Sequence, residues 1–407
     1  MRRLRQILIF IVGLSIPFNN VAFSFAGRNW SVGLISSALY FLVMLSDFPK
    51  FPRIASSGKY VFNTLWFAIL LTFINLLNEN FYNTPIIPIT LFMCCFLMYA
   101  MLLHDTLDKG VVRQCIYGMG VGCILMAILF LCGVGVELGD DNRLQMFGEN
   151  SNTLGIYSCV GNIIMFNDWI LKDGLKLKKI RFMLLIAYIP LVVLLFATGS
   201  RVAFLAYVLS FVLSVVFFRP KAMRRKIIVV LMAVLVCFVL YNISQSSDFV
   251  LFQRLLSTAE EGDLSGRDTI LTSLKPYIIQ HIFGGVGQTG YVEISYDALG
   301  YVLSNGGTVY GESPHNVLVE ILLYTGILGL LLYLIFWYKV FACSILKFRE
   351  SADILPVLLL IPIAGCVLSG QILGAKWAFI IYAYIITSVS RRDLSYYELA
   401  STKIPTK

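Results

Sequence analysis

Apolar residues fill the chain in long stretches that recur from residue 7 to residue 390, with short polar segments between them. A helix needs roughly 20 apolar residues to cross a bilayer. The pattern therefore predicts an all-α polytopic membrane protein with about twelve transmembrane helices. The predicted spans lie near residues 7–25, 30–46, 60–77, 86–103, 115–136, 153–171, 182–198, 201–218, 227–243, 315–341, 354–371 and 376–390.

The one large break in this pattern is the polar segment 244–314, which predicts a loop between the ninth and tenth helices. It divides the chain into residues 1–243 with nine helices, the loop, and residues 315–407 with three helices and a tail. The loop contains partly amphipathic stretches such as DTILTSLKPYIIQHIF. Such stretches predict one or two short helices lying on the membrane surface.

A single arginine interrupts the apolar run LLFATGSRVAFLAYVLSF at residues 194–211. The apolar stretch around it is too long for one span and suits two. Thr198-Gly199-Ser200 is a run of small residues of the kind that reverses a chain. The sequence therefore predicts a helical hairpin with Arg201 at its tip, and not an arginine buried in lipid.

The composition agrees with a membrane protein: 58% of the residues are hydrophobic, 14% are charged, and the mean hydropathy is +0.81. The net charge of +9 comes from short basic loops between apolar stretches. That distribution is typical of topology signals, whereas a nucleic-acid-binding protein presents a continuous basic face. We therefore expect the lipid bilayer as a partner and no nucleic acid.

Lysine and arginine set the orientation, because they are retained on the cytoplasmic side. With both termini cytoplasmic, most of the 32 basic residues fall on the inner side. The basic N-terminus is then the start of an uncleaved first helix, and the loop 244–314 lies outside. The few basic residues left on the outer side are Arg28, Arg143, Arg201, Arg254, Arg267, Lys275 and Lys376.

The nine cysteines form no CxxC pair and no cluster with histidine, so the sequence predicts neither a metal site nor a disulfide framework, and no cofactor. GGVGQTG at 284–290 contains a literal GxGxxG. No strand-turn-helix unit surrounds it, so we do not expect a nucleotide site. Its glycines are better explained by a loop that turns tightly against the helix bundle.

Outer arginines are candidates for binding an anion, because guanidinium is always charged and grips phosphate with two parallel hydrogen bonds. Arg201 lies at the hairpin tip, Arg267 follows Ser-Gly at the start of a predicted helix, and Arg254 lies in the outer loop. Structural alternatives stay open: a snorkelling side chain for Arg201, and an ion pair with Asp263 or Asp268 for Arg267.

His315 is predicted to open a helix in GESPHNVLVEILLYTGILGLL, where Ser-Pro precedes it. Histidine is the side chain that exchanges a proton near neutral pH. Asn316 would lie beside it at the outer mouth of the bundle, and Glu320 one turn further could accept from it or line a cavity. The alternative is a hydrogen-bonded histidine at the membrane interface.

The segment RLQMFGENSNTLG, residues 143–155, places further polar groups at the outer mouth of the sixth helix. Arg143 and Asn152 are candidates for binding sugar hydroxyls or phosphate, and Glu149 and Asn150 lie between them. Asn152 precedes an apolar run, so it could equally be a helix N-cap.

Four segments together resemble the O-antigen ligase and polymerase superfamily of bacterial envelope glycan assembly. They are ATGSR at 197–201, SGRDTI at 265–270 leading to IFGGVGQTGY, SPHNVLVEILLYTGILGLL at 313–331, and RLQMFGENSNTLG. The match runs from residue 143 to residue 331 in order and in predicted topology.

The resemblance implies a metal-independent glycosyltransferase in the bacterial cytoplasmic membrane. Its donor would be a glycan on undecaprenyl diphosphate and its acceptor a hydroxyl. Arg201 and Arg267 would hold the diphosphate, and His315 would act near the acceptor. Developing charge on the leaving diphosphate calls for fixed cations, and the attacking hydroxyl needs a base or an orienting acceptor.

The leading hypothesis is a polymerase that joins lipid-linked repeat units of an O-antigen or capsule-type polysaccharide, with a chain-length regulator as a further expected partner. The alternative within this chemistry is a ligase that transfers the finished glycan to lipid A-core. An alternative of another class is a transporter or flippase. Charges at the helix mouths, and not in mid-membrane, argue against transport.

Overall fold

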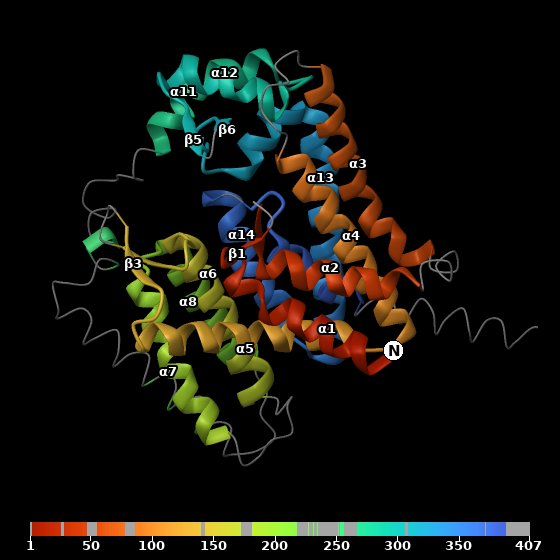
Figure 1. The fold of residues 1–407 in the computed structure, drawn as a ribbon, viewed down its shortest axis with the longest axis vertical. Helices are drawn as coiled ribbons and strands as arrows, with labels where there is room; N and C mark the ends of the chain where they lie inside the picture. Colours follow the sequence, from red (N-terminus) through yellow and green to blue (C-terminus); the bar gives the residue numbers. More distant parts are fainter. Residues whose placement is uncertain are drawn as a thin grey trace, which may run out of the picture. The chain divides into compact units, whose positions relative to one another are not determined.

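The computed structural model describes residues 2–25, 28–46, 55–77, 86–139, 143–171, 181–217, 267–305, 308–370 and 372–387, with isolated positions between 227 and 255. Most of this chain is helical (Figure 1). The helices are α1 (Arg2–Leu14), α2 (Val32–Leu45), α3 (Ala55–Leu77), α4 (Ile86–Leu107), α5 (Val111–Leu131), α6 (Ser151–Ile164), α7 (Arg181–Ala197), α8 (Arg201–Phe217), α11 (Arg267–Gln280), α12 (Gly287–Leu299), α13 (Val317–Ser351), α14 (Leu355–Ser369) and a last helix at Lys376–Thr387.

Short elements join these helices. A 3₁₀ turn (Ile16–Phe18) follows α1, and a π-helix, η3 (Met165–Leu171), continues α6. Three two-stranded antiparallel hairpins are made by β1 (Ala22–Phe25) with β2 (Arg28–Ser31), β3 (Val136–Leu138) with β4 (Leu144–Met146), and β5 (Leu303–Asn305) with β6 (Thr308–Tyr310).

Most predicted spans coincide with observed helices, but several differ in extent. The span predicted over 315–341 is α13, which continues to Ser351, and the span predicted over 115–136 is α5, which already ends at Leu131. The span predicted over 7–25 is α1 only as far as Leu14 and ends in the 3₁₀ turn and β1. Pro17 explains this end, because its ring clashes with the carbonyl four residues earlier in an α-helix. The span predicted over 227–243 lies almost wholly outside the described residues, so the number twelve stays a prediction.

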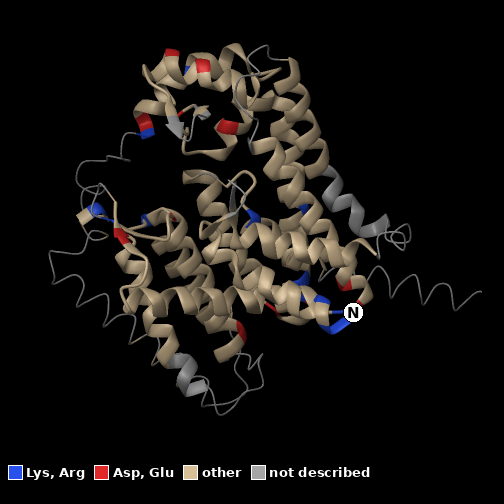
Figure 2. Cartoon of the chain, viewed as in Figure 1, with Lys and Arg blue, Asp and Glu red and all other residues tan. Residues whose placement is uncertain are grey.

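Three described helices are long and apolar enough to cross a membrane: Ile87–Leu107, Val111–Leu131 and Val317–Ser351. Further apolar helices are shorter, among them α7 and α8. Charged residues are few along the helices and lie mainly near their ends or in the connecting segments (Figure 2). The predicted class of helical membrane protein is confirmed.

The chain forms two compact units, each assembled from separate parts of the sequence. Unit 1 contains residues 1–43, 113–263 and 354–365. Unit 2 contains residues 44–112, 264–353 and 366–407. Both cores are therefore closed by contacts between segments far apart in the chain.

In unit 1, α6 packs against both α7 and α8, and these two form the predicted hairpin. The turn is Thr198-Gly199-Ser200, and Gly199 has a φ of 61°. A left-handed residue at this place lets the chain reverse between two helices, and glycine adopts it without steric cost. Arg201 is the first residue of α8, as the sequence predicts.

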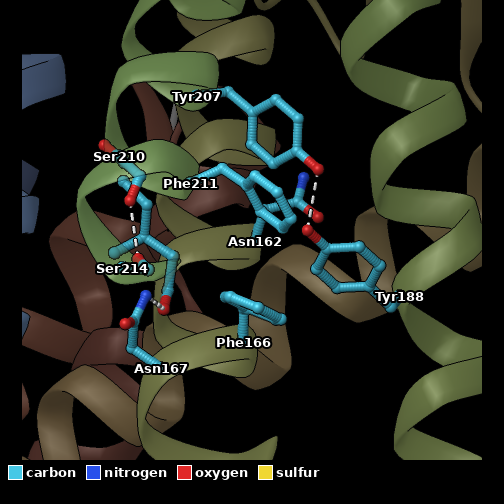
Figure 3. A pocket seen from close by; sticks show the side chains of 9 residues that line it. Asn162, Phe166, Asn167, Tyr188, Tyr207, Ser210, Phe211 and Ser214 are labelled. Atoms are coloured by element: carbon cyan, nitrogen blue, oxygen red, sulfur yellow. Dashed lines mark hydrogen bonds between the residues drawn. The ribbon is translucent and has the colours of Figure 1, made fainter. Parts of the chain in front are cut away.

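Uncharged polar side chains meet inside this three-helix core (Figure 3). The Tyr188 and Tyr207 hydroxyls lie 2.7 Å apart, and Asn162 donates to the Ser158 carbonyl at 2.9 Å. The side chains of Asn162, Tyr188, Tyr207 and Ser210 line a cavity of about 10 Å³. That is the space of one water molecule.

In unit 2, α3 packs against α13 and α4, and α12 packs against α3 and α13. Figure 1 shows α11 and α12 at one end of the α3–α13 pair. Asn75 of α3 fixes α12 there, because its amide oxygen accepts from the Thr289 N–H at 3.1 Å. Gln288 accepts from the Ile87 N–H of α4 at 3.0 Å.

A buried carboxylate joins α5 to the π-helix in unit 1. Asp168 is fully buried and accepts from Arg113, whose side chain is 39% exposed. The Arg113 guanidinium also lies 5.6 Å from the centre of the Tyr117 ring. The pair compensates a charge that would otherwise be costly to bury.

Arg113→Met is expected to destabilise the protein by about 3 kcal/mol, the lower end of the range for breaking a buried pair, because Arg113 is partly exposed. Asp168→Asn added to Arg113→Met should recover much of this loss, since no uncompensated charge remains. Thermal unfolding of the purified protein in detergent measures both. Equal stability of the single and double variants would contradict the pairing.

Candidate functional site

The eight site residues predicted from the sequence fall into two groups of four, one in each unit. Unit 1 holds Arg143, Asn152, Arg201 and Arg254. Unit 2 holds Arg267, His315, Asn316 and Glu320. Each group is described by itself.

The α7–α8 turn is the centre of the unit 1 group. The Arg143 Nε donates to the Thr198 carbonyl at 3.1 Å, and the Arg254 Nη1 donates to the Gly199 carbonyl at 3.1 Å. Arg201 Nη1 in turn donates to the Arg254 carbonyl at 3.4 Å. Three arginines that are far apart in the sequence therefore meet at one turn.

These contacts have a local cause in helix chemistry. The last carbonyls of a helix lack partners within the helix and carry partial negative charge. Thr198 and Gly199 directly follow α7, and the guanidinium groups of Arg143 and Arg254 supply the missing donors. Arg201 opens α8, and the positive end of the helix dipole favours an anion there.

Asn152 belongs to this group and is not the N-cap of α6. Asn150 is the N-cap, because its side chain accepts from the Thr153 N–H at 2.8 Å. Asn152 instead accepts from Arg143 Nη2 at 2.7 Å. The capping alternative for Asn152 is therefore wrong, and its side chain helps to orient a buried arginine.

Glu149 is a buried carboxyl group in the turn between β4 and α6, to which the sequence reasoning assigned no role. Only 5% of it is exposed. Burial raises the pKa of Glu149 to about 7, although an N–H of the Asn20 backbone partly offsets this effect. The pKa of Glu149 could not be inferred from the sequence, because its cause is burial of the carboxyl group by the tertiary packing.

The unit 2 group begins with His315, which does not open α13 as predicted. Asn316 is the N-cap and α13 starts at Val317. His315 stands just before the cap with a φ of 50°, and its N–H donates to the Ser313 hydroxyl at 3.1 Å. This left-handed backbone turns the histidine out of the helix that follows.

Two charged neighbours surround His315. Its Nε2 lies 3.9 Å from Glu312 Oε1, and Arg267 is close enough for its charge to act on the imidazole. Burial and the Arg267 charge lower the pKa of His315, and Glu312 partly counteracts them. The histidine is therefore neutral at neutral pH and free to accept a proton.

Arg267 is the first residue of α11, as predicted from the Ser-Gly that precedes it. The structure thus brings Arg267 and His315 into one site, although 48 residues separate them in the sequence. Asn316 is occupied by capping, because its side-chain oxygen accepts from the N–H groups of Leu318 at 3.0 Å and Val319 at 3.3 Å.

Glu320 is buried in α13 and does not serve as the partner of His315. Its carboxylate interacts with the Tyr324 hydroxyl, and Oε2 has no hydrogen bond within the described part of the chain. The carboxylate beside His315 is Glu312, which the sequence reasoning missed. Glu312 is held by α12: its N–H donates to the Ser295 hydroxyl at 2.8 Å, and the Tyr291 hydroxyl donates to its carbonyl at 2.5 Å.

Among the described residues, no three His, Cys, Asp or Glu side chains lie close enough together to hold a metal ion. The polar groups that gather in the two units are mainly arginines, one neutral histidine and carboxylates. Side chains of these types are able to bind anions and to exchange protons.

Between about pH 4.5 and pH 7 the folded protein should hold the Glu149 proton more tightly than the unfolded chain does. Its unfolding free energy should therefore fall as the pH rises through this window. Glu149→Gln removes the titration, and the variant should gain thermal stability relative to the parent at pH 8 and not at pH 4.5. An identical pH dependence of Tm in both proteins would refute the assignment.

A protein-family model matches the part of the chain that holds most of the candidate site residues. Residues 186–334 match the model of the Wzy_C family, described as O-antigen ligase. The segment includes Arg201, Arg254, Arg267 and His315. No curated protein matches the chain. The chain therefore carries, over residues 186–334, a domain of the O-antigen ligase and polymerase superfamily, which confirms the resemblance seen in its sequence.

Proposed function

We propose that the protein is a polysaccharide polymerase of the bacterial cytoplasmic membrane, with both termini in the cytoplasm. It transfers a glycan from an undecaprenyl-diphosphate carrier to a hydroxyl of another lipid-linked repeat unit at the outer face. Two features within residues 186–334 support the proposal. One is the cluster of arginines at the α7–α8 turn, and the other is the neutral His315 beside Arg267.

The arginines suit the donor. A lipid diphosphate gains negative charge as its bond to the sugar breaks, and fixed cations stabilise that charge. Arg201 is half-buried at the N-terminus of α8, while Arg143 and Arg254 hold the turn that carries it. Arg267 supplies a second fixed cation at the start of α11.

His315 suits the acceptor. In the proposed step the acceptor oxygen attacks the anomeric carbon, the bond from that carbon to the phosphate oxygen breaks, and the lipid diphosphate leaves. The hydroxyl proton passes to His315, which is able to accept it because Arg267 and burial favour the neutral imidazole. Glu312 then stabilises the imidazolium at a distance of 3.9 Å.

The ligase is the second candidate, favoured by the description of the matched family as O-antigen ligase. It uses the same donor chemistry and differs in its acceptor, lipid A-core. Transport is less well supported. The sequence places its charges at the helix mouths and not in mid-membrane, where transporters usually bind their substrates.

Purified protein in liposomes with undecaprenyl-diphosphate-linked repeat units is expected to lengthen the glycan without nucleotide or added metal. Arg201→Ala and Arg267→Ala should each lower the rate by about 100-fold or more, since each removes a donor to the leaving group. Lysine at either position should rescue poorly, because bidentate geometry is lost.

Lys275→Ala on α11 and Arg349→Ala on α13 are matched controls, because both side chains are exposed, and both should retain parental rates. Chain growth that requires lipid A-core would favour the ligase. Movement of the lipid-linked unit across the bilayer with no glycan transfer would favour the flippase. Parental activity in both the Arg201→Ala and the Arg267→Ala variant would contradict the proposed role of the two cations.

The pH profile of kcat/KM should show an acid limb with its midpoint below 6.5, the ordinary pKa of histidine, because Arg267 and burial favour neutral His315. His315→Gln should lose this limb and about 100-fold or more of the rate. His104→Gln is the control, since that histidine is buried in α4 on the predicted cytoplasmic side. An unchanged profile in His315→Gln would remove His315 from the chemistry.

A further inference from the structure

The long helix α13 contains a break at Gly326, which has a φ of 63° and a ψ of −164°. In an unbroken helix the Ile327 N–H would donate to the Leu323 carbonyl, four residues earlier. The break opens this bond and leaves a donor and an acceptor inside an apolar helix. Such groups are costly without partners, especially at membrane depth.

The segment that follows α11 supplies both partners. The Ile327 N–H donates to the Ile282 carbonyl at 2.7 Å, and the Val286 N–H donates to the Leu323 carbonyl at 2.8 Å. One hydrogen bond within α13 is thus replaced by two bonds to residues 282–286. We call this backbone contact between residues 282–286 and residues 323–327 the α13 joint.

Two glycines make the joint sterically possible. A Cβ on Gly285 would lie 2.5 Å from the Thr325 nitrogen, and a Cβ on Gly326 would lie 2.6 Å from the Phe283 carbonyl carbon. Both obstacles are backbone atoms, which cannot move aside as a side chain does. Gly285 also has a φ of 66°. By contrast, a Cβ on the neighbouring Gly284 would meet no atom within 4 Å.

The joint lies at the far end of the helix that carries Arg267. The 14 residues of α11 span about 20 Å from Arg267 to Gln280, and residue 282 follows just after this end. A small change of angle at the joint is therefore enlarged at Arg267. The other partner of the joint, α13, begins two residues after His315.

We propose that Gly285 and Gly326 are positioning residues that hold the Arg267 helix and the His315 end of α13 as one rigid piece. This inference rests on the proposed function, in which both side chains act on the same transfer. A misplacement of about 1 Å can cost about 100-fold in rate. Gly285, which the sequence analysis attributed to a tight turn, and Gly326 together set the distance between cation and base.

Three variants of the full-length protein test the joint. Gly285→Ala and Gly326→Ala introduce the clash, and Gly284→Ala is the matched control. Ile327→Pro is a gentler third variant that keeps the test available if the alanine variants do not fold. It removes the N–H that donates to Ile282 and adds no Cβ at either glycine. The ψ of −164° at Gly326 suits a residue before proline, and proline is accepted where a helix restarts.

Two readouts are needed in detergent-purified protein that elutes as a single species. The first is the pKa of His315, from the pH dependence of its modification by diethylpyrocarbonate, read by mass spectrometry with an added histidine-containing peptide as internal standard. The second is kcat in the liposome assay. We expect Gly285→Ala, Gly326→Ala and Ile327→Pro to raise the His315 pKa toward 6.5, as Arg267→Gln does, because the cation moves away. The two alanine variants should also lower kcat by about 10-fold or more.

A folded joint variant whose His315 pKa equals that of the Gly284→Ala control would overturn the inference, whatever its activity. Because that readout needs no turnover, failure of the proposed function remains distinct. If the parent protein transfers no glycan but the His315 pKa shifts as expected, the joint stands and the proposed function falls. Lost activity with an unshifted pKa would reduce the glycines to a structural role.

Discussion

Backbone groups at helix ends and helix breaks need hydrogen-bond partners within the protein wherever packing excludes water. Two places in this chain show how that demand shapes the structure. At the α7–α8 turn, the guanidinium groups of Arg143 and Arg254 satisfy the carbonyls of Thr198 and Gly199. At the break in α13, residues 282–286 satisfy the groups that Gly326 sets free.

Both solutions also organise the candidate site. The turn that gathers Arg143 and Arg254 is the turn that ends at Arg201, so the structural arginines fix the place of the one proposed to bind diphosphate. The α13 joint ties α11, which begins at Arg267, to the helix that follows His315. In each unit the same contacts that stabilise the fold set the geometry of a charged side chain.

The protonation state of His315 is set by the groups around it. A cation alone would favour neutral imidazole, and a carboxylate alone would favour imidazolium. His315 has Arg267 and Glu312 as neighbours, and its burial adds to the effect of the cation. The result is a histidine that can take a proton and can then be stabilised once charged.

Much of the fold was predictable because apolar length and small-residue turns are local properties. The hairpin at Thr198-Gly199-Ser200, the start of α11 at Arg267 and nearly all helix positions follow from such patterns. The exceptions are also instructive. Pro17 shortens the first helix, and Asn150 takes the capping role expected of Asn152. In both cases the apolar pattern leaves open at which residue the helix begins or ends.

The sequence by itself determined the class of the protein, the family of its segment 186–334, and which residue types serve an anion and a proton. Only the tertiary structure decided how they are used. Arg143 and Arg254 face carbonyls, Glu312 and not Glu320 lies beside His315, and Glu149 is buried enough to titrate near neutral pH. The physical reason is that pKa and hydrogen-bond partners depend on neighbours brought together by packing, which sequence spacing does not encode.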